Sequence, residues 1–203
     1  MSALVTRAIA EAGLDAWLAR RFRDEGTDED RVMLARACRE LDLLVLGALA
    51  DRVRGRECGP FVRLHVDRPP NDEHVLGLDP LHSGHELMRR VASARLSSAP
   101  RTPLRIDAEA VGLPVAQLAL AFGADEIVTP VKRMSLEVYG EGEQAVLRER
   151  ELASLVRGAG RDPVIVQWRD GRAYERAVDE KTSARRRFRA PGREARAERE
   201  GEA

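Results

Sequence analysis

Two shortages in the sequence each exclude a class of protein. The 203 residues include only two cysteines, Cys38 and Cys58, too few for the disulfide framework of a small secreted domain. No apolar run approaches the ~20 residues that a transmembrane helix requires. The amino terminus also lacks the pattern of a signal peptide, because Glu11 and Asp15 interrupt its apolar residues early. We therefore expect a cytoplasmic protein that does not cross a membrane.

Net charge and catalytic signature motifs are lacking as well. Lysine plus arginine and aspartate plus glutamate each number 34, so no net field attracts nucleic acid or a lipid surface. Any partner must then be recognised by a local surface patch. The sequence contains no P-loop, no glycine-rich dinucleotide loop after a strand and no nucleophile elbow. Motifs alone therefore make no case for an enzyme, and nucleic acid is not an expected partner.

The length fits one buried domain with additions at both ends. Residues 1–28 read as an amphipathic helical segment, either one helix or a pair broken at Gly13, that packs on the outside of the domain. Residues 29–174 carry the apolar patterns of an α/β domain. Residues 175–203 mix both charges with almost no apolar side chains, which predicts a disordered tail. Alternatively, the arginine cluster at 185–189 makes this tail an interaction module.

The stretch 111–131 shows why an α/β fold is expected. Pro114 suits the first turn of a helix, where its missing N–H costs nothing. The helical period then places on one apolar face the residues Val115, Leu118, Ala119 and Phe122. Gly123 follows as a left-handed helix stop, and the run from Glu126 to Val131 reads as a strand. A helix followed directly by a strand is the unit of parallel sheets and barrels.

Similar patterns predict the other elements. A long helix is expected over 30–54, with Thr27 and Asp30 as its capping pair, and a capping box at Ser83 and Glu86 opens another helix. A further helix is expected over 143–157, and strands near Phe61, Leu104, Ile127 and Val164. The predicted fold class is therefore α/β, with three or four mainly parallel strands covered by helices.

Several segments resemble, in the same order, the radical SAM enzymes of futalosine-dependent menaquinone synthesis (aminofutalosine synthase and dehypoxanthine futalosine cyclase) and FO synthase. The late part of their barrel is similar to VASARL at 91–96 and AQLALAFGADE at 116–126. The helix before their first barrel strand is similar to LDLLVLGALADRVRG at 41–55. Their C-terminal helix and final extended segment are similar to RERELASLVRGAGRDPVIVQWRDGRAY at 148–174. The resemblance implies a remnant of a radical-SAM-type (βα) barrel.

The chemistry of that family depends on a [4Fe–4S] cluster, held by three thiolates of a CxxxCxxC run after the first strand. Here residues 67–80 read DRPPNDEHVLGLDP, without a cysteine. Most central βα units of the family barrel are also missing. The family's acidic pair is kept as Asp125 and Glu126, but Thr129 and Pro130 replace its Gly-Thr. The resemblance therefore implies a non-catalytic protein without a cofactor, acting as an accessory or regulatory binding subunit.

A second hypothesis is a small cluster-independent enzyme or a metal-binding protein. Barrel sites form at the carboxyl ends of strands, which makes His65, Asp107 and Glu109 the candidate substrate-binding residues. On an edge strand, His65 would instead face water. His82 and His85 stand at i, i+3 near a helix start, either as a ligand pair for zinc or iron or as solvated loop residues. Their sequence HSGHE matches none of the zinc-peptidase motifs.

A partial barrel also leaves open sheet edges and apolar surface to be covered. A second copy of the chain or another protein would cover them, and two-fold homodimers are the commonest assembly of this kind. The long helix over 30–54 could instead close the gap within one chain. We therefore expect a homodimer or a protein partner.

Overall fold

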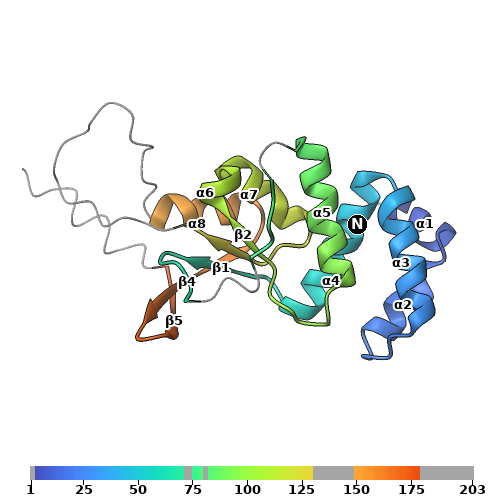
Figure 1. The fold of residues 1–203 in the computed structure, drawn as a ribbon, viewed down its shortest axis with the longest axis horizontal. Coiled ribbons are helices and arrows are strands. Elements are labelled where there is room, and N and C mark those ends of the chain that lie inside the picture. Colours follow the sequence, from blue (N-terminus) through green and yellow to red (C-terminus); the bar gives the residue numbers. More distant parts are fainter. Residues whose placement is uncertain (1–2, 71–74, 80–81, 130–148, 179–203) are drawn as a thin grey trace, which may run out of the picture.

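The structure is a computed structural model that describes residues 3–70, 75–79, 82–129 and 149–178. One five-stranded sheet is covered by helices (Figure 1). The strands are β1 (Phe61–His65), β2 (Arg105–Asp107), β3 (Glu126–Val128), β4 (Asp162–Arg169) and β5 (Arg172–Ala177). The helices are α1 (Ala3–Glu11), α2 (Leu14–Arg21), α3 (Asp28–Glu40), α4 (Leu43–Cys58), α5 (Gly84–Ser97), α6 (Ala108–Val111), α7 (Leu113–Ala119), the 3-10 helix η1 (Leu120–Phe122) and α8 (Glu149–Gly158).

The strand order is β2-β3-β1-β4-β5, and every pair is parallel except β4 with β5. This confirms the predicted mainly parallel sheet, which is open among the described residues. The fifth strand was not predicted. It follows a two-residue turn in which Asp170 and Gly171 have φ of 51° and 74°, the backbone that joins antiparallel strands tightly. Strand β5 therefore continues to Ala177, past the domain boundary predicted at Tyr174.

The two faces of the sheet differ in character, because residues in register on parallel neighbours share a face. One face carries apolar side chains with almost no exposure: Val62, Leu64, Ile106, Ile127 and Ile165. Helix α7 packs against β2, and α8 packs against β1 and β4, within the same core. The opposite face, called the polar face below, carries Arg63, His65, Arg105, Asp107, Glu126 and Trp168.

The helices before β1 form the end of the molecule farthest from β5, with α4 and α5 next to the sheet (Figure 1). Helices α1 and α2 are a pair broken at Gly13, whose φ is 70°, as one of the two alternatives predicts. The prediction of a single helix over 30–54 is wrong, because α3 ends and α4 begins within it. The Asp42 carboxylate accepts hydrogen bonds from the backbone N–H of Leu44 and Val45 (2.8 and 3.4 Å) and starts a new helix.

Both predicted capping boxes are present. The Thr27 N–H donates to Asp30 Oδ2 (2.9 Å) and the Asp30 N–H to Thr27 Oγ1 (3.2 Å). The same reciprocal bonds join Ser83 and Glu86 at the start of α5. Hydrogen bonding from Arg20 to the Asp30 carboxylate lowers the pKa of Asp30 to about 2, so this cap keeps its charge at neutral pH.

The stretch that predicted the α/β fold is right in outline and wrong in one detail. Pro114 lies in the first turn of α7, and Gly123 ends the helical segment with φ of 101°. However, Leu118 is 49% exposed, whereas Leu120 is fully buried. The buried residues Ala116, Ala119 and Leu120 stand at i, i+3 and i+4, so they follow the helical period on a face that is shifted from the predicted one.

Three predicted features lie outside the described residues. They are the end of the strand at 130–131, the first turns of the helix at 143–148 and the charged tail from 179 onward. None of the helices in the described ranges combines the length and the apolarity that are needed to span a bilayer.

Candidate functional site

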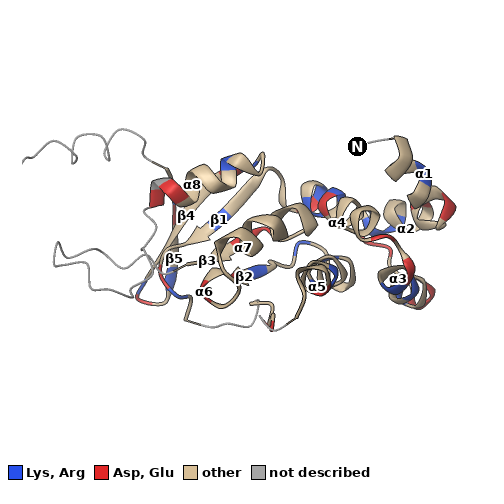
Figure 2. Cartoon of the chain, turned by 90° about the horizontal axis from the view of Figure 1, so that it is seen from above, with Lys and Arg blue, Asp and Glu red and all other residues tan. Residues whose placement is uncertain are grey.

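A row of charged side chains crosses the polar face of the sheet. Arg63 of β1 is in register with Glu126 of β3, which is in turn in register with Arg105 of β2. Figure 2 shows basic residues in blue on β1 and β2. The next row toward the carboxyl ends holds His65 on β1 and Asp107 on β2. The fold therefore brings the predicted site residues His65 and Asp107 to one edge of the sheet.

Glu126 is the centre of the charged row. Its Oε2 accepts hydrogen bonds from Arg105 Nε (2.5 Å) and from His65 Nε2 (2.9 Å). Arg63 Nη1 lies 4.0 Å from its other oxygen. Burial raises the pKa of Glu126, but the hydrogen bonds from His65 and Arg105 outweigh burial and hold the pKa below its usual value. Glu126 is therefore a carboxylate at neutral pH.

His65 has a defined tautomer. Its Nδ1 lies 3.0 Å from Trp168 Nε1, and an indole N–H can only donate. Nδ1 must therefore accept, so the ring proton is on Nε2 and is donated to Glu126. The imidazole is neutral, stacks on the Trp168 ring with 6.1 Å between centroids and is only 2% exposed. Because both ring nitrogens are occupied, His65 orders the polar face and has no lone pair left for a ligand.

Asp107 and Glu109 form a separate group on the same edge. Asp107 caps the short helix α6, because its Oδ1 accepts from the backbone N–H of Glu109 (2.9 Å). Arg68 donates to Asp107 Oδ2 (3.0 Å), and its Nη2 lies 3.6 Å from Glu109 Oε2. The predicted trio is therefore split: Asp107 and Glu109 share Arg68 at the half-exposed rim, while His65 is buried against Glu126.

The candidate metal ligands are dispersed. His82 Nδ1 lies 4.0 Å from Asp79 Oδ2, and the exposed His85 makes no further cluster with them. The Glu86 carboxylate is occupied by the Ser83 cap, which lowers the pKa of Glu86. Within the described ranges, no three His, Cys, Asp or Glu side chains gather as a metal ion requires. His74 lies outside those ranges.

A buried ion pair joins two of the segments that carry the family resemblance. Arg95 of α5 pairs with Asp125, and it also donates to the carbonyls of Gly123 (Nε, 2.7 Å) and Thr102 (Nη1, 2.8 Å). Asp125 Oδ1 in turn accepts from the Leu104 N–H (2.8 Å). The acidic pair of the sequence therefore has two roles, because adjacent residues face opposite sides: Asp125 binds α5, and Glu126 faces the polar side.

Gly123 allows this ion pair to form. A Cβ added there would lie 2.9 Å from the Arg95 Cβ, in a backbone conformation that side chains rarely adopt. Cys58 lies beside the same pair, as the last residue of α4. Burial, followed by the charge of Asp125, raises the pKa of the Cys58 thiol to about 11. At neutral pH this thiol is protonated, and therefore it is a poor metal ligand.

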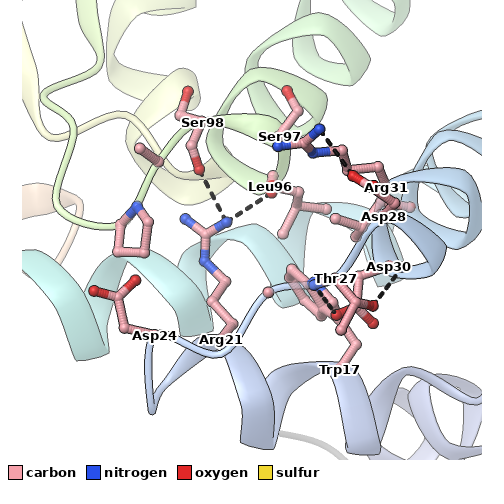
Figure 3. Close-up of a pocket in the computed structure, with 14 residues that line it drawn as sticks. Trp17, Arg21, Asp24, Thr27, Asp28, Asp30, Arg31, Leu96, Ser97 and Ser98 are labelled. Atoms are coloured by element: carbon pink, nitrogen blue, oxygen red, sulfur yellow. Dashed lines mark hydrogen bonds and ion pairs between the residues drawn. The ribbon is translucent and has the colours of Figure 1, made fainter.

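A hollow of about 340 Å³ lies between the α2–α3 connection and the end of α5 (Figure 3). Its walls include Trp17, Arg21, Asp30 and Ser98. Arg21 donates to the carbonyls of Leu96 (2.7 Å) and Ser98 (3.1 Å) and pairs with Glu57. Arg21 therefore holds α2 to α5 and, through Glu57, to α4, whereas Asp30 binds Arg20 and joins α3 to α2.

The sequence analysis did not select Arg63, Arg105 or Trp168 as site residues. The available signal was a charged residue flanked by apolar ones, as in Leu104 to Ile106, inside a strand of a parallel sheet, whose two faces are usually covered. Of these groups, the two guanidiniums keep donors that the described contacts do not use. No family model matches the chain, and a search of curated proteins found no match either. The polar face must therefore be interpreted from its own residues.

Proposed function

We propose that the chain is a non-catalytic relative of the radical SAM enzymes of futalosine-dependent menaquinone synthesis, and that it acts as an accessory or regulatory binding subunit. The observation that supports this most is the parallel pairing of β3 with β1. By the sequence resemblance, β1 corresponds to the first barrel strand and β3 to a late one. In a closed barrel the last strand pairs in parallel with the first, so β2-β3-β1 is the order expected where a barrel closes.

Strand β4 has a matching explanation. It pairs in parallel with β1 on the side opposite to β3, where the second strand of a barrel would lie. By the resemblance it belongs to the final extended segment, so in this proposal β4 takes the place of the missing central strands. The polar face then corresponds to the inside of a barrel, where the carboxyl ends of strands carry binding residues.

The residues present do not fit a radical SAM cluster. The family's three thiolates follow the first strand, whereas Cys38 and Cys58, the only cysteines of the chain, precede β1. Cys58 is also turned toward the Arg95–Asp125 pair, as its raised pKa reflects. A binding role that needs no cluster is therefore the function that the polar face supports best.

The partner in this proposal is a second copy of the chain or another enzyme of the pathway. Strand β5 is mostly exposed, and no described strand pairs with its outer edge. An open edge of this kind offers backbone donors and acceptors to another chain.

Genetic replacement tests the proposed role. We expect a strain without the gene to contain less menaquinone. A chain with Cys38→Ser and Cys58→Ser should restore the menaquinone content fully, because in this proposal neither thiol holds a cofactor. The quinone content of cell extracts, measured by mass spectrometry, reads this out. The wild-type chain is the positive control, and the folded-chain level in each strain is compared by immunoblot.

An unchanged menaquinone content in the deletion strain would overturn the proposed role. So would a cysteine-free chain that accumulates normally and yet fails to restore the quinone, because it would show that the thiols act.

A further inference from the structure

One buried nitrogen of the polar face has no hydrogen-bond partner among the described residues. It is Nη1 of Arg105, a residue that is only 7% exposed. Among the described residues this guanidinium bonds to Glu126 through its Nε, and His65 donates to the same Glu126 oxygen. A buried donor without an acceptor is destabilising, and native proteins almost always satisfy such groups. The arrangement therefore points to an acceptor that the chain itself does not supply.

Arg63 lies on the other side of Glu126 in the same row. Its Nε donates to Glu175 Oε1 (2.5 Å), and its side chain is 40% exposed. The row is therefore closed at Arg105 and open to solvent at Arg63, which gives a small ion a way in. Arg63 and Arg105 lie on the two strands that flank β3, one on each side of Glu126.

We propose that this row binds a small planar oxyanion with a single charge, a carboxylate or bicarbonate, between Arg105 Nη1 and Arg63. This deepens the binding role proposed above and rests on it. A planar oxyanion matches the donor geometry of guanidinium groups. The two arginine charges are already balanced by Glu126 and Glu175, and His65 is neutral, so a doubly charged ligand would be repelled more strongly than a singly charged one. The site therefore selects monoanions over phosphate.

Nuclear magnetic resonance of the full-length chain tests this, with formate as the probe. The indole N–H of Trp168 reports on the site through His65 and Glu126, and the indole N–H of Trp17, in α2, is the internal control. We expect a saturable shift of the Trp168 signal, with a Kd on the order of 1–10 mM for so few hydrogen bonds, and no shift for Trp17. Inorganic phosphate should give no saturable shift of Trp168.

Variants locate the ion. Arg105→Lys keeps the positive charge beside Glu126 but replaces the several planar N–H donors of the guanidinium with a single ammonium group. The affinity for formate should therefore fall about tenfold or more. Arg63→Gln, at a half-exposed position, should weaken binding without unfolding the chain. Arg31→Gln is the matched control, because Arg31 is an exposed arginine on α3. It should leave the affinity unchanged.

Three results would overturn the proposal: no saturable shift with formate, equal affinity in wild type and in both site variants, or tighter binding of phosphate than of formate. These results concern the ligand only. If formate binding fails while the deletion strain still lacks menaquinone, the ligand class is wrong and the subunit role stands. If formate binds and menaquinone is unaffected by deletion, the subunit role is wrong and the ion site stands.

Discussion

Asp125→Ala is expected to lower the free energy of unfolding by about 3–5 kcal/mol, because it leaves the Arg95 guanidinium charged and unpaired in the core. The other partners of Arg95 are the carbonyls of Gly123 and Thr102, which carry no net charge. A domain is stable by only about 5–15 kcal/mol in total, so this one change makes the chain marginal. Urea unfolding followed by far-UV circular dichroism measures the difference.

Glu40→Ala is the matched control for this substitution. Glu40 pairs with Arg36 one turn away on the exposed side of α3, and we expect its loss to cost below about 0.5 kcal/mol. The double variant Arg95→Met with Asp125→Leu removes both charges and should recover part of the stability that Asp125→Ala loses. If Asp125→Ala proved as mild as Glu40→Ala, the buried pair would not be holding α5 to the sheet.

Leu120→Asp should prevent stable folding. Leu120 is fully buried in the main core, and a carboxylate there has no partner to offset a desolvation cost of several kcal/mol. Leu118→Asp, two residues earlier, makes the same chemical change at a half-exposed position and should cost less than about 1 kcal/mol. Thermal melting of the two variants compares them directly. Equal losses would mean that Leu118, on the face predicted from the sequence, is packed as closely as Leu120.

The features that the sequence predicts correctly are those fixed by neighbouring residues. Pro114 and Gly123 set the start and the stop of the central helical segment through their own backbone preferences. The capping box at Thr27 depends on a residue only three positions away. Short β-branched runs place the parallel strands for the same reason, since each strand needs little beyond its own apolar residues.

Two local signals were available and were outweighed by the pattern around them. Asp42 is a good helix cap, but the apolar stripe continues on both sides of it and suggests one helix. Asp170 and Gly171 are the strongest short signal for a hairpin, yet the strand that follows is mostly exposed and has few apolar residues. At Asp42 an apolar pattern that spans the break favours one helix, and after Gly171 the lack of apolar residues hides the strand.

The site could be predicted only in part, because its contacts join distant residues. His65 and Asp107 could be predicted because they lie at the carboxyl ends of strands. The hydrogen bond between His65 and Trp168, however, spans 103 sequence positions, and the one between His65 and Glu126 spans 61. No periodicity shows that these bonds occupy both nitrogens of His65. Likewise, only the fold shows that one arginine of the row has a donor left over.

The central claim is that the chain keeps the strands at which a barrel closes but lacks the cofactor chemistry of the family. Its most direct test is anaerobic reconstitution of the purified chain with iron, sulfide and S-adenosylmethionine. Iron and sulfide are then measured per chain, together with cleavage of S-adenosylmethionine after reduction. With two cysteines, both before β1, we expect iron far below one cluster per chain and no cleavage. A stoichiometric [4Fe–4S] cluster that cleaves S-adenosylmethionine would contradict the account.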